Sequence, residues 1–467
     1  MKTDARAAFW ALTLALVALL AAPLPATAAE AEKPLPQILI TNVNVWDGTS
    51  DDLEKADVLV EGNLIKQVAA GIRAPAGAEV IDGGGRTLIP GLIDMHSHLS
   101  IMEGMLDGRD AFDQMAIGAM TGNVLRSYLD QGFTSTMDLG GNVLGVAKAV
   151  NLGKIPGPRI FPSGGFLSQT GGHGDTGRFN DELGATNRLT DVDFAHIVNG
   201  RAQVLQAARH NFRAGATQVK LMGGGGVASE FDPLHATQFT LEEMKAAVQV
   251  AEDYGTFATV HAYHDRSVNR ALDAGVRLIQ HNFLVSEETV ARMKREGAAL
   301  DLQAWVALVQ FGNADEITFF SADQKAKGTA VNKGATQMIE WARKHDLLIV
   351  TGGDMFGQNN APVQALNLTI METVGFEPLE ILKTATSNAA IVLGWTGEMN
   401  PYKDAYPDLT ADEKANKGTG LGVIEEGAYA DMVLVDGNPL EDITLLKDYT
   451  NNFKLIVKDG EVWKNTL

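Results

Sequence analysis

The sequence predicts an α/β protein, a (β/α)8 TIM barrel joined to a small β-sandwich domain that both ends of the chain build. Short apolar runs alternate with helix-length segments through the middle of the chain, which is typical of parallel strands linked by helices. Both chain ends instead carry short strand patterns separated by turns. The length of 467 residues is enough for one large domain and one smaller one.

We expect residues 1–29 to be a cleaved signal peptide. Basic residues precede an apolar run over 7–22, and Ala26-Thr27-Ala28 supplies the small residues of a cleavage site. A retained membrane anchor needs roughly 20 apolar residues, and two prolines close this run too early. We therefore expect an exported protein, periplasmic or secreted.

The two chain ends are predicted to form the β-sandwich, from residues 30–88 and 421–467. The strand-like runs at the two ends are 38–46, 57–61, 64–68, 430–436 and 453–459. Turn signals such as Asp47-Gly48 and Gly62-Asn63 separate them. We expect the two ends to pair into one sheet domain.

Residues 89–395 are predicted to form the barrel. The first of its eight strand-like runs begins two residues earlier, in the predicted β-sandwich. The eight runs are Thr87–Asp94, Phe133–Asp138, Arg159–Pro162, Thr217–Met222, Phe257–His261, Val276–His281, Ala299–Leu302 and Leu347–Gly352. Eight strands in series with helix-length connections favour a barrel, and a doubly wound open sheet is the alternative. Residues 396–420, rich in Asp, Lys, Pro and Tyr, are expected to form a surface excursion.

Composition restricts the chemistry and the partners. The chain has no cysteine, so it forms no disulfide, and a metal site must use nitrogen and oxygen ligands. Its formal net charge of -20 argues against nucleic acid and anionic membranes as partners.

Candidate metal ligands fall at the carboxyl ends of the predicted strands. His96 and His98 are two residues apart, so in a strand both side chains point to one face. The full set in chain order is His96, His98, Lys220, His261, His281 and Asp354. Barrel enzymes keep their active sites at this end of the strands, so the set predicts a metal site.

Several motifs resemble those of the amidohydrolase superfamily. They are Pro90–His98, Val219-Lys220, Val260-His261-Ala262, Gln280-His281-Asn282, Gly352-Gly353-Asp354 and the closing run Ala430–Pro439. Within the superfamily the chain most resembles the Xaa-Pro dipeptidase-like and imidazolonepropionase-like branch. That branch includes bacterial amidohydrolases that split ochratoxin.

The resemblance implies a site with two zinc ions, other divalent metals being possible. It implies that His96, His98 and Asp354 bind one ion, that His261 and His281 bind the second, and that Lys220 bridges them as a carbamate formed with carbon dioxide. A carbamate supplies anionic charge with two oxygens, and burial favours the neutral amine that forms it.

The resemblance also implies roles in hydrolysis. Asp354 takes a proton from the water that the metals activate and returns it to the leaving amine, and His173 is the candidate oxyanion donor. Tyr263 is a candidate for holding a substrate carboxylate. The glycine-rich run that includes Gly225 and ends at Ser229 could offer backbone amides to the same anion, and a plain flexible turn is the alternative.

The expected function is a binuclear zinc amidohydrolase that removes a C-terminal amino acid from N-acyl amino acids or dipeptides, ochratoxin-type amides included. A cyclic-amide hydrolase of the imidazolone or lactam type is the alternative within the enzymes. An exported metal-binding or scaffold protein with a decayed active site is the third hypothesis. We expect a small-molecule substrate and, because relatives form them, a homo-oligomer. We expect four other histidines to be structural: His196, His210, His235 and His345. We expect His264 to be either a neighbour of the site or a surface residue.

Overall fold

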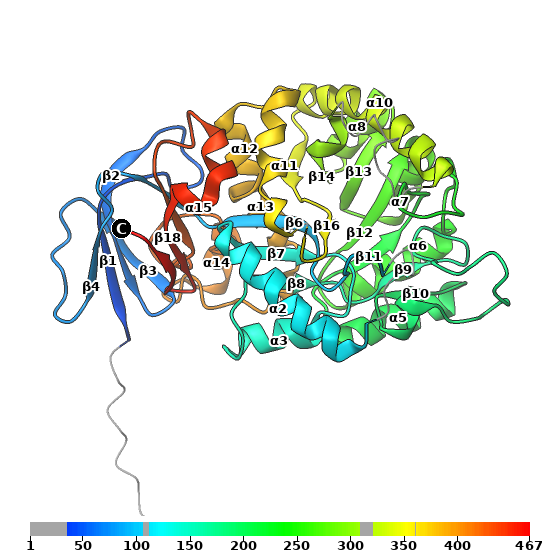
Figure 1. Ribbon diagram of the computed structural model, residues 1–467, viewed down its shortest axis with the longest axis horizontal. Coiled ribbons are helices and arrows are strands. Elements are labelled where there is room, and N and C mark those ends of the chain that lie inside the picture. The colour runs from blue at the N-terminus through cyan, green and yellow to red at the C-terminus, as the bar shows by residue number, and fades with distance from the viewer. Residues whose placement is uncertain (1–34, 106–111, 309–320, 360) are drawn as a thin grey trace, which may run out of the picture. The chain divides into compact units, whose positions relative to one another are not determined.

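The computed structural model describes residues 35–105, 112–308, 321–359 and 361–467. The predicted signal peptide, 1–29, lies outside the described residues. The chain divides into a unit of residues 1–36 and a compact unit of residues 37–467, and the latter holds every sheet described below (Figure 1). In the described ranges, no helix is both long and apolar enough to cross a membrane.

Both ends of the compact unit contribute to one eight-stranded sheet. Its strands are β1 (Gln37–Val45), β2 (Glu54–Glu61), β3 (Leu64–Ala69), β4 (Glu79–Asp82), β5 (Thr87–Pro90), β17 (Met432–Val435), β18 (Phe453–Lys458) and β19 (Glu461–Asn465). The order is β19-β18-β17-β5-β1-β2-β3, with β4 beside β1. Strand β5 runs parallel to β1 and antiparallel to β17, so it joins the two ends of the chain. The buried side chains of Ile40, Val58 and Leu434 form part of the core beneath this sheet.

The first predicted strand, Thr87–Asp94, is wrong as a single element. The run breaks at Gly91, whose N–H donates to the carbonyl of Asp431 at 2.8 Å. A Cβ at position 91 would come within 2.1 Å of Oγ1 of Thr134, so only glycine fits this crossing. A new strand, β6 (Leu92–His98), starts after the break. His96 and His98 therefore lie inside a strand rather than after one.

The middle of the chain forms two parallel sheets, as an α/β fold requires. The smaller has the order β16-β6-β7-β8 and the larger β10-β9-β11-β12-β13-β14-β15. Besides β6, their strands are β7 (Phe133–Asp138), β8 (Arg159–Pro162), β9 (Phe166–Ser168), β10 (Ala195–Ile197), β11 (Val219–Met222), β12 (Ala258–His264), β13 (Leu278–Leu284), β14 (Ala299–Leu302), β15 (Leu348–Thr351) and β16 (Met355–Phe356). Each of the eight predicted runs contains or overlaps one of these strands.

Backbone hydrogen bonds join the two parallel sheets at two places. The N–H of Thr217, just before β11, donates to the carbonyl of Pro162 at the end of β8 (2.8 Å). The N–H of Asp354, just after β15, donates to the carbonyl of His96 in β6 (2.8 Å). One bond thus links the β8 end of the smaller sheet to the larger sheet, and the other links β6 of the smaller sheet to the segment after β15.

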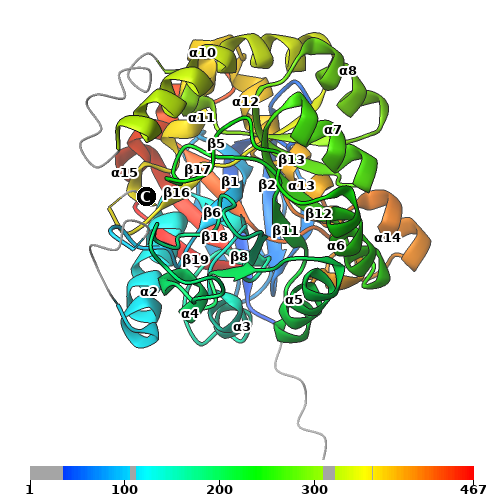
Figure 2. The ribbon, with the colours of Figure 1, turned by 90° about the vertical axis from the view of Figure 1, so that its right-hand side faces the viewer.

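Helices lie outside the parallel strands, as Figure 2 shows. The helices are α2 (Gln114–Asp130), α3 (Leu144–Asn151), α4 (Arg188–Asp191), α5 (Arg201–Ala214), α6 (Leu241–Asp253), α7 (Asp265–Ala274), α8 (Glu287–Arg295), α10 (Ala322–Lys344), α11 (Leu366–Met371), α12 (Pro378–Thr384), α13 (Ser387–Gly394), α14 (Ala411–Lys417) and α15 (Tyr449–Asn452). The 3-10 turns are η1 (Ala304–Ala307), η3 (Ala361–Val363), η4 (Glu372–Val374), η5 (Gly397–Met399) and η6 (Ile443–Asp448). Capping boxes at Thr240 and Ser321 satisfy backbone N–H groups where α6 and α10 begin.

The predicted surface excursion over 396–420 lies only partly at the surface. Helix α14 buries none of its residues. Ala405 and Tyr406 are buried, however, and the hydroxyl of Tyr402 accepts a hydrogen bond from the N–H of Ile160 (2.9 Å). Aromatic and apolar residues within a polar segment explain why it packs against the body of the unit.

A buried ion pair fixes the C-terminal strands against β8. Nε of Arg159 lies 3.1 Å from a carboxylate oxygen of Asp431, and both side chains are 3% exposed. The guanidinium also lies over the ring of Tyr429, 4.0 Å from its centroid. A buried charge of this kind is tolerated only because it is paired.

Candidate active site

A cluster of two histidines and an aspartate forms the centre of the site. His96 and His98 project from the same face of β6, with ring centroids 5.3 Å apart. Their Nε2 atoms lie 3.4 Å and 3.3 Å from the same carboxylate oxygen, Oδ1 of Asp354. These three side chains offer ligand atoms close enough to hold one metal ion.

The backbone at Asp354 is specialised for this approach. Asp354 has a φ of +53°, in the left-handed region that side chains other than glycine seldom adopt. A Cβ at Gly352 would come within 2.3 Å of the backbone N of His96, so the chain can pass here only with glycine. Such local strain is concentrated at functional sites.

Two more histidines, His261 of β12 and His281 of β13, extend the cluster. Their ring centroids lie 4.6 Å apart, and the ring of His281 lies 5.2 Å from that of His96. His281 and Asn282 both have positive φ, +72° and +62°, where the pairing of β12 with β13 loses its regular register. The structure therefore brings all four predicted histidine ligands together.

Three of the four imidazoles have one ring nitrogen held by an acceptor. The pairs are His98 Nδ1 with the Gly140 carbonyl (3.0 Å), His261 Nε2 with the Gly225 carbonyl (3.3 Å) and His281 Nδ1 with Gln303 Oε1 (2.7 Å). Nδ1 of the fourth, His96, lies 3.2 Å from Oδ2 of Asp301 and 3.3 Å from the amide nitrogen of Gln303. When the nitrogen held by an acceptor carries the proton, the other nitrogen of the ring is left as a metal ligand. Histidine ligands in metalloproteins are oriented in this way.

Lys220 is the second residue of β11 (Val219–Met222) and is buried, 2% exposed. Its Nζ donates to Oε1 of Gln280 at 2.6 Å. Burial lowers the pKa of Lys220 to about 7, although the carboxylates of Asp354 and Asp301 raise it. A substantial fraction of this amine is therefore neutral near pH 7.

The charge states of the cluster suit a divalent cation. Burial lowers the pKa of His281 to about 3 and holds the pKa of His96 and of His261 well below the ordinary value. Burial alone would raise the pKa of Asp354, but the neighbouring histidines lower it more, so the carboxylate stays ionised. His98 differs, because Asp354 and Asp138 raise its pKa although burial lowers it. Neutral imidazoles with an ionised carboxylate are the ligand set that zinc takes in proteins, so His98 would lose its proton when a metal binds.

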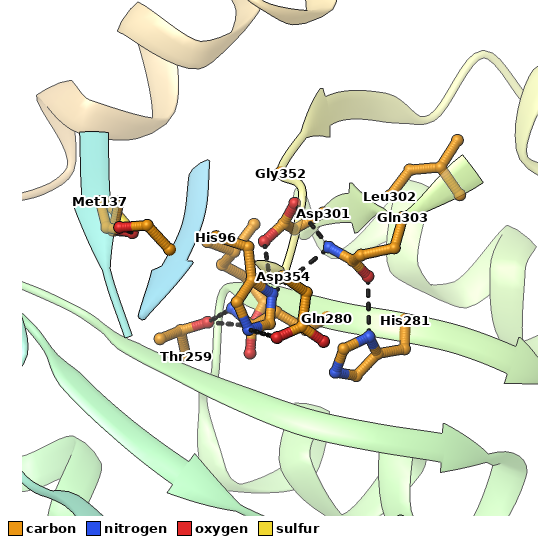
Figure 3. A network of polar contacts seen from close by, with 12 residues as sticks. His96, Met137, Thr259, Gln280, His281, Asp301, Leu302, Gln303, Gly352 and Asp354 are labelled. Carbon is orange, nitrogen blue, oxygen red and sulfur yellow. Dashed lines mark hydrogen bonds and ion pairs between the residues drawn. The ribbon is translucent and has the colours of Figure 1, made fainter. Parts of the chain in front are cut away.

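Two buried residues of this site, Asp301 and Gln303, were not predicted. Figure 3 shows Gln303 between His96 and His281, with Asp301 beside it. The amide Nε2 of Gln303 donates to Oδ1 of Asp301 at 3.2 Å, while its Oε1 faces His281. The two side chains therefore orient histidines from β6 and β13 together. A carboxylate inside the apolar run Ala299–Leu302 was the signal that could have found Asp301.

His173, the predicted oxyanion donor, borders the cluster. It lies on the loop after β9, and its ring stacks on that of His261 with centroids 4.0 Å apart and planes at 17°. Its Nδ1 lies 2.7 Å from Oγ of Ser229.

Tyr263 lies on the same face of β12 as His261, as the alternation along a strand predicts. Its ring centroid is 4.9 Å from that of His261 and 5.3 Å from that of His281. The side chain is buried, and burial raises the pKa of its phenol, which therefore stays protonated and able to donate a hydrogen bond. Its contact with a substrate stays a prediction.

The expectation that Gly225 offers its backbone amide to a substrate anion is wrong for this structure. The N–H of Gly225 already donates to the carbonyl of Ala236 at 3.1 Å. The hydroxyl of Ser229 is engaged with His173 rather than free for a ligand. The loop after Lys220 thus satisfies these groups with hydrogen bonds of its own.

The histidines expected to be structural do not join the cluster. His196 is bonded to Asn211 (2.9 Å), and His345 to Glu287 (2.9 Å). Half-buried His264 is the residue before α7.

Comparison with known proteins agrees with the geometry of the site. The sequence model of the amidohydrolase family matches residues 87–414. Ochratoxinase of Aspergillus niger is 29% identical over 376 residues, which cover 77% of this chain and 72% of that protein. The crystal structure of a prolidase complexed with N-methylphosphonate-L-proline is 31% identical, with a TM-score of 0.82 over 92% of this chain and all of that one. A Xaa-Pro dipeptidase with bound methionine in its active site is 26% identical, with a TM-score of 0.78 over 92% of this chain and all of that one. The chain therefore belongs to the amidohydrolase family and is a hydrolase that acts on amide bonds.

Proposed function

We propose that this protein is an exported, binuclear zinc amidohydrolase that releases the C-terminal amino acid from N-acyl amino acids or dipeptides, ochratoxin-type amides included. One observation supports it most: four imidazoles cluster together, two of them against the carboxylate of Asp354, and three have one ring nitrogen held by an acceptor. Histidines that bind a metal are oriented by such acceptors, and here the oriented rings lie together beside a carboxylate.

We also propose that the two parallel sheets form one (β/α)8 barrel and that the eight-stranded sheet belongs to a β-sandwich domain. The hydrogen bonds from Thr217 to Pro162 and from Asp354 to His96 support closure of the barrel, because they connect strands of the two parallel sheets. The site then lies at the carboxyl ends of the barrel strands, where such enzymes bind substrates.

The ligand sets proposed for the two ions follow the family motifs. One ion would be held by His96, His98 and Asp354 and the other by His261 and His281, and the carbamate of Lys220 would supply anionic charge to both. When bound, divalent cations polarise a carbonyl group and lower the pKa of water. The neutral fraction of buried Lys220 supports the carbamate, because only a neutral amine reacts with carbon dioxide.

The protein's own groups then divide the work of hydrolysis. The ionised carboxylate of Asp354 accepts a proton from the attacking water and delivers it to the leaving amine. His173, beside His261, donates a hydrogen bond to the oxygen on which negative charge develops. Tyr263 donates its phenol proton to the free carboxylate of the substrate.

The relatives support this class of substrate. Ochratoxinase is named for its action on ochratoxin, and the prolidase is complexed with a phosphonate derivative of proline. Both names point to a substrate with an acyl group on an amino acid.

A substrate panel tests the proposal directly. Zinc-loaded protein would be given N-acyl-phenylalanine, Xaa-Pro dipeptides, ochratoxin and a lactam, before and after treatment with a chelator. We expect chelator-sensitive release of a free amino acid from the linear amides. Turnover of the lactam alone would favour the cyclic-amide alternative, and bound zinc without any hydrolysis would favour the decayed scaffold.

Export and assembly need separate measurements. N-terminal sequencing of the protein recovered from the periplasm or medium should begin near residue 29 or 30 if the predicted signal peptide is cleaved. Light scattering on the purified protein should give a mass of several chains if it forms the expected homo-oligomer.

A further inference from the structure

The loop that follows Lys220 folds around His173. Asp232, only 2% exposed, lies at the centre of this loop. Its Oδ2 accepts a hydrogen bond from the N–H of Gly226 (2.9 Å) and lies 3.5 Å from Nδ1 of His173. One carboxylate oxygen therefore contacts both the loop and the imidazole.

Gln238 connects the same carboxylate to the backbone at His173. Its Nε2 donates to Oδ2 of Asp232 at 3.2 Å, and its Oε1 accepts from the N–H of His173 at 2.9 Å. Asp232 is therefore linked to the main chain of His173 through Gln238, and it contacts the imidazole directly.

Gly226 leaves the space that the imidazole occupies. A Cβ at this position would come within 2.0 Å of Cε1 and 2.1 Å of Nδ1 of His173. The backbone of Gly226 is not in the positive-φ region, so its conformation alone does not require glycine. The close approach of the ring is what excludes a side chain here.

The ring of His173 is therefore confined on several sides. It stacks on His261 at 4.0 Å, it covers Gly226, and both Ser229 and Asp232 approach its Nδ1. Because these contacts occupy Nδ1, Nε2 is the ring nitrogen that remains for a substrate, and it donates to an oxygen there when the ring carries a proton on both nitrogens.

Lys327 of α10 offsets the cost of burying Asp232. Its Nζ donates to the carbonyl of Ser229 at 2.9 Å, lies 3.8 Å from Oδ1 of Asp232 and pairs with exposed Asp323 at 3.1 Å. Burial raises the pKa of Asp232, but His173, Ser229 and Lys327 together lower it by more than burial raises it. The carboxylate therefore stays ionised. A buried carboxylate is costly unless it is paired. The groups that pair with Asp232 include the imidazole of His173 and the ammonium group of Lys327.

We propose that Asp232 and Gly226 are positioning residues that fix the imidazole of His173 against His261, with Nε2 directed to the substrate. This inference rests on the proposed function, because it assumes that His173 donates to the developing oxyanion. It gives the glycine-rich loop a role that differs from binding the substrate carboxylate.

Steady-state kinetics of four variants test it: His173→Ala, Asp232→Asn, Gly226→Ala and the double variant His173→Ala/Gly226→Ala. Loss of one oxyanion donor lowers kcat by roughly 10²- to 10³-fold. We expect His173→Ala and Gly226→Ala to lower kcat by that order with little change in KM, and Asp232→Asn to lower it in the same direction. The double variant should be no slower than His173→Ala, because residues that act through one group are not additive.

Two controls separate positioning from general damage. Asp323→Asn removes the other carboxylate near Lys327 without a contact to His173, and Gly145→Ala adds a methyl group where no atom lies within 4 Å. Both should keep wild-type kcat, and all variants should keep the wild-type zinc content. Wild-type kcat in Asp232→Asn and Gly226→Ala, or a double variant whose losses multiply, would overturn the inference while leaving the proposed function intact. Failure of the wild-type protein to hydrolyse any linear amide would instead count against the proposed function.

Discussion

Oε1 of Gln303 lies 2.7 Å from Nδ1 of His281, and this contact joins a residue just after β14 to a candidate metal ligand on β13. The amide of Gln303 also bonds to Asp301, which in turn faces His96. The orientation of two histidines therefore depends on one buried amide.

Replacement of this amide should weaken metal binding. Loss of a hydrogen bond that orients a histidine ligand typically costs roughly 10- to 100-fold in metal affinity. We expect Gln303→Leu to raise the zinc dissociation constant by that order, measured by competition with a chromophoric chelator. Gln337→Leu is the control, because that glutamine is exposed on α10 and donates to exposed Glu340. Equal affinity in wild type and Gln303→Leu would contradict the role.

Lys220 should be indispensable for turnover. Lys220→Ala cannot form a carbamate, and we expect activity to fall to background and the zinc content to drop. Lys220→Arg keeps a cation at the position but also cannot be carboxylated, so it should be equally inactive. Activity and metal analysis on the same samples check this. Full activity in either variant would contradict a bridging carbamate.

The rate of reactivation should depend on pH through Lys220. Its pKa is lowered to about 7 by burial, so the amine is protonated below that pH and neutral above it. When metal-free protein is mixed with zinc and bicarbonate, the rate of recovery, corrected for dissolved carbon dioxide, should rise as pH increases through about 7 and then level off. A rate that falls or stays constant over pH 6–8 would contradict a neutral, reactive lysine.

The buried pair of Arg159 and Asp431 should matter for stability rather than for catalysis. Arg159→Met leaves the carboxylate of Asp431 buried without its cation, a change that costs about 3–5 kcal/mol. The free energy of unfolding, measured with denaturant, should fall by that amount. Arg343→Met, which breaks an exposed pair with Glu380, should cost about 0–1 kcal/mol. A difference of less than 1 kcal/mol between the two variants would contradict the assignment.

Much of the site followed from the sequence because strand periodicity is a local property. The spacing of His96 and His98 predicts one face of a strand, and the structure has both on β6 beside Asp354. Tyr263 shares the face of His261 for the same reason. These inferences need only the two-residue repeat of a strand and the order of the elements.

The parts that sequence reasoning missed depend on contacts between distant segments. The break at Gly91 is set by Thr134 on a neighbouring strand, and nothing in the apolar run Thr87–Asp94 marks it except the glycine. The amide of Gly225 is taken by Ala236, which no local pattern predicts. Gln303 has its role only because β6 and β13 approach it together.

Zinc titration of metal-free protein, with hydrolysis of N-acyl-phenylalanine as the readout and bicarbonate present throughout, tests the binuclear metal site most directly. We expect no activity without metal and a rise that reaches its plateau at two zinc ions per chain. Full activity in excess chelator would contradict a metal-dependent hydrolase, and a plateau at one ion per chain would contradict the binuclear centre.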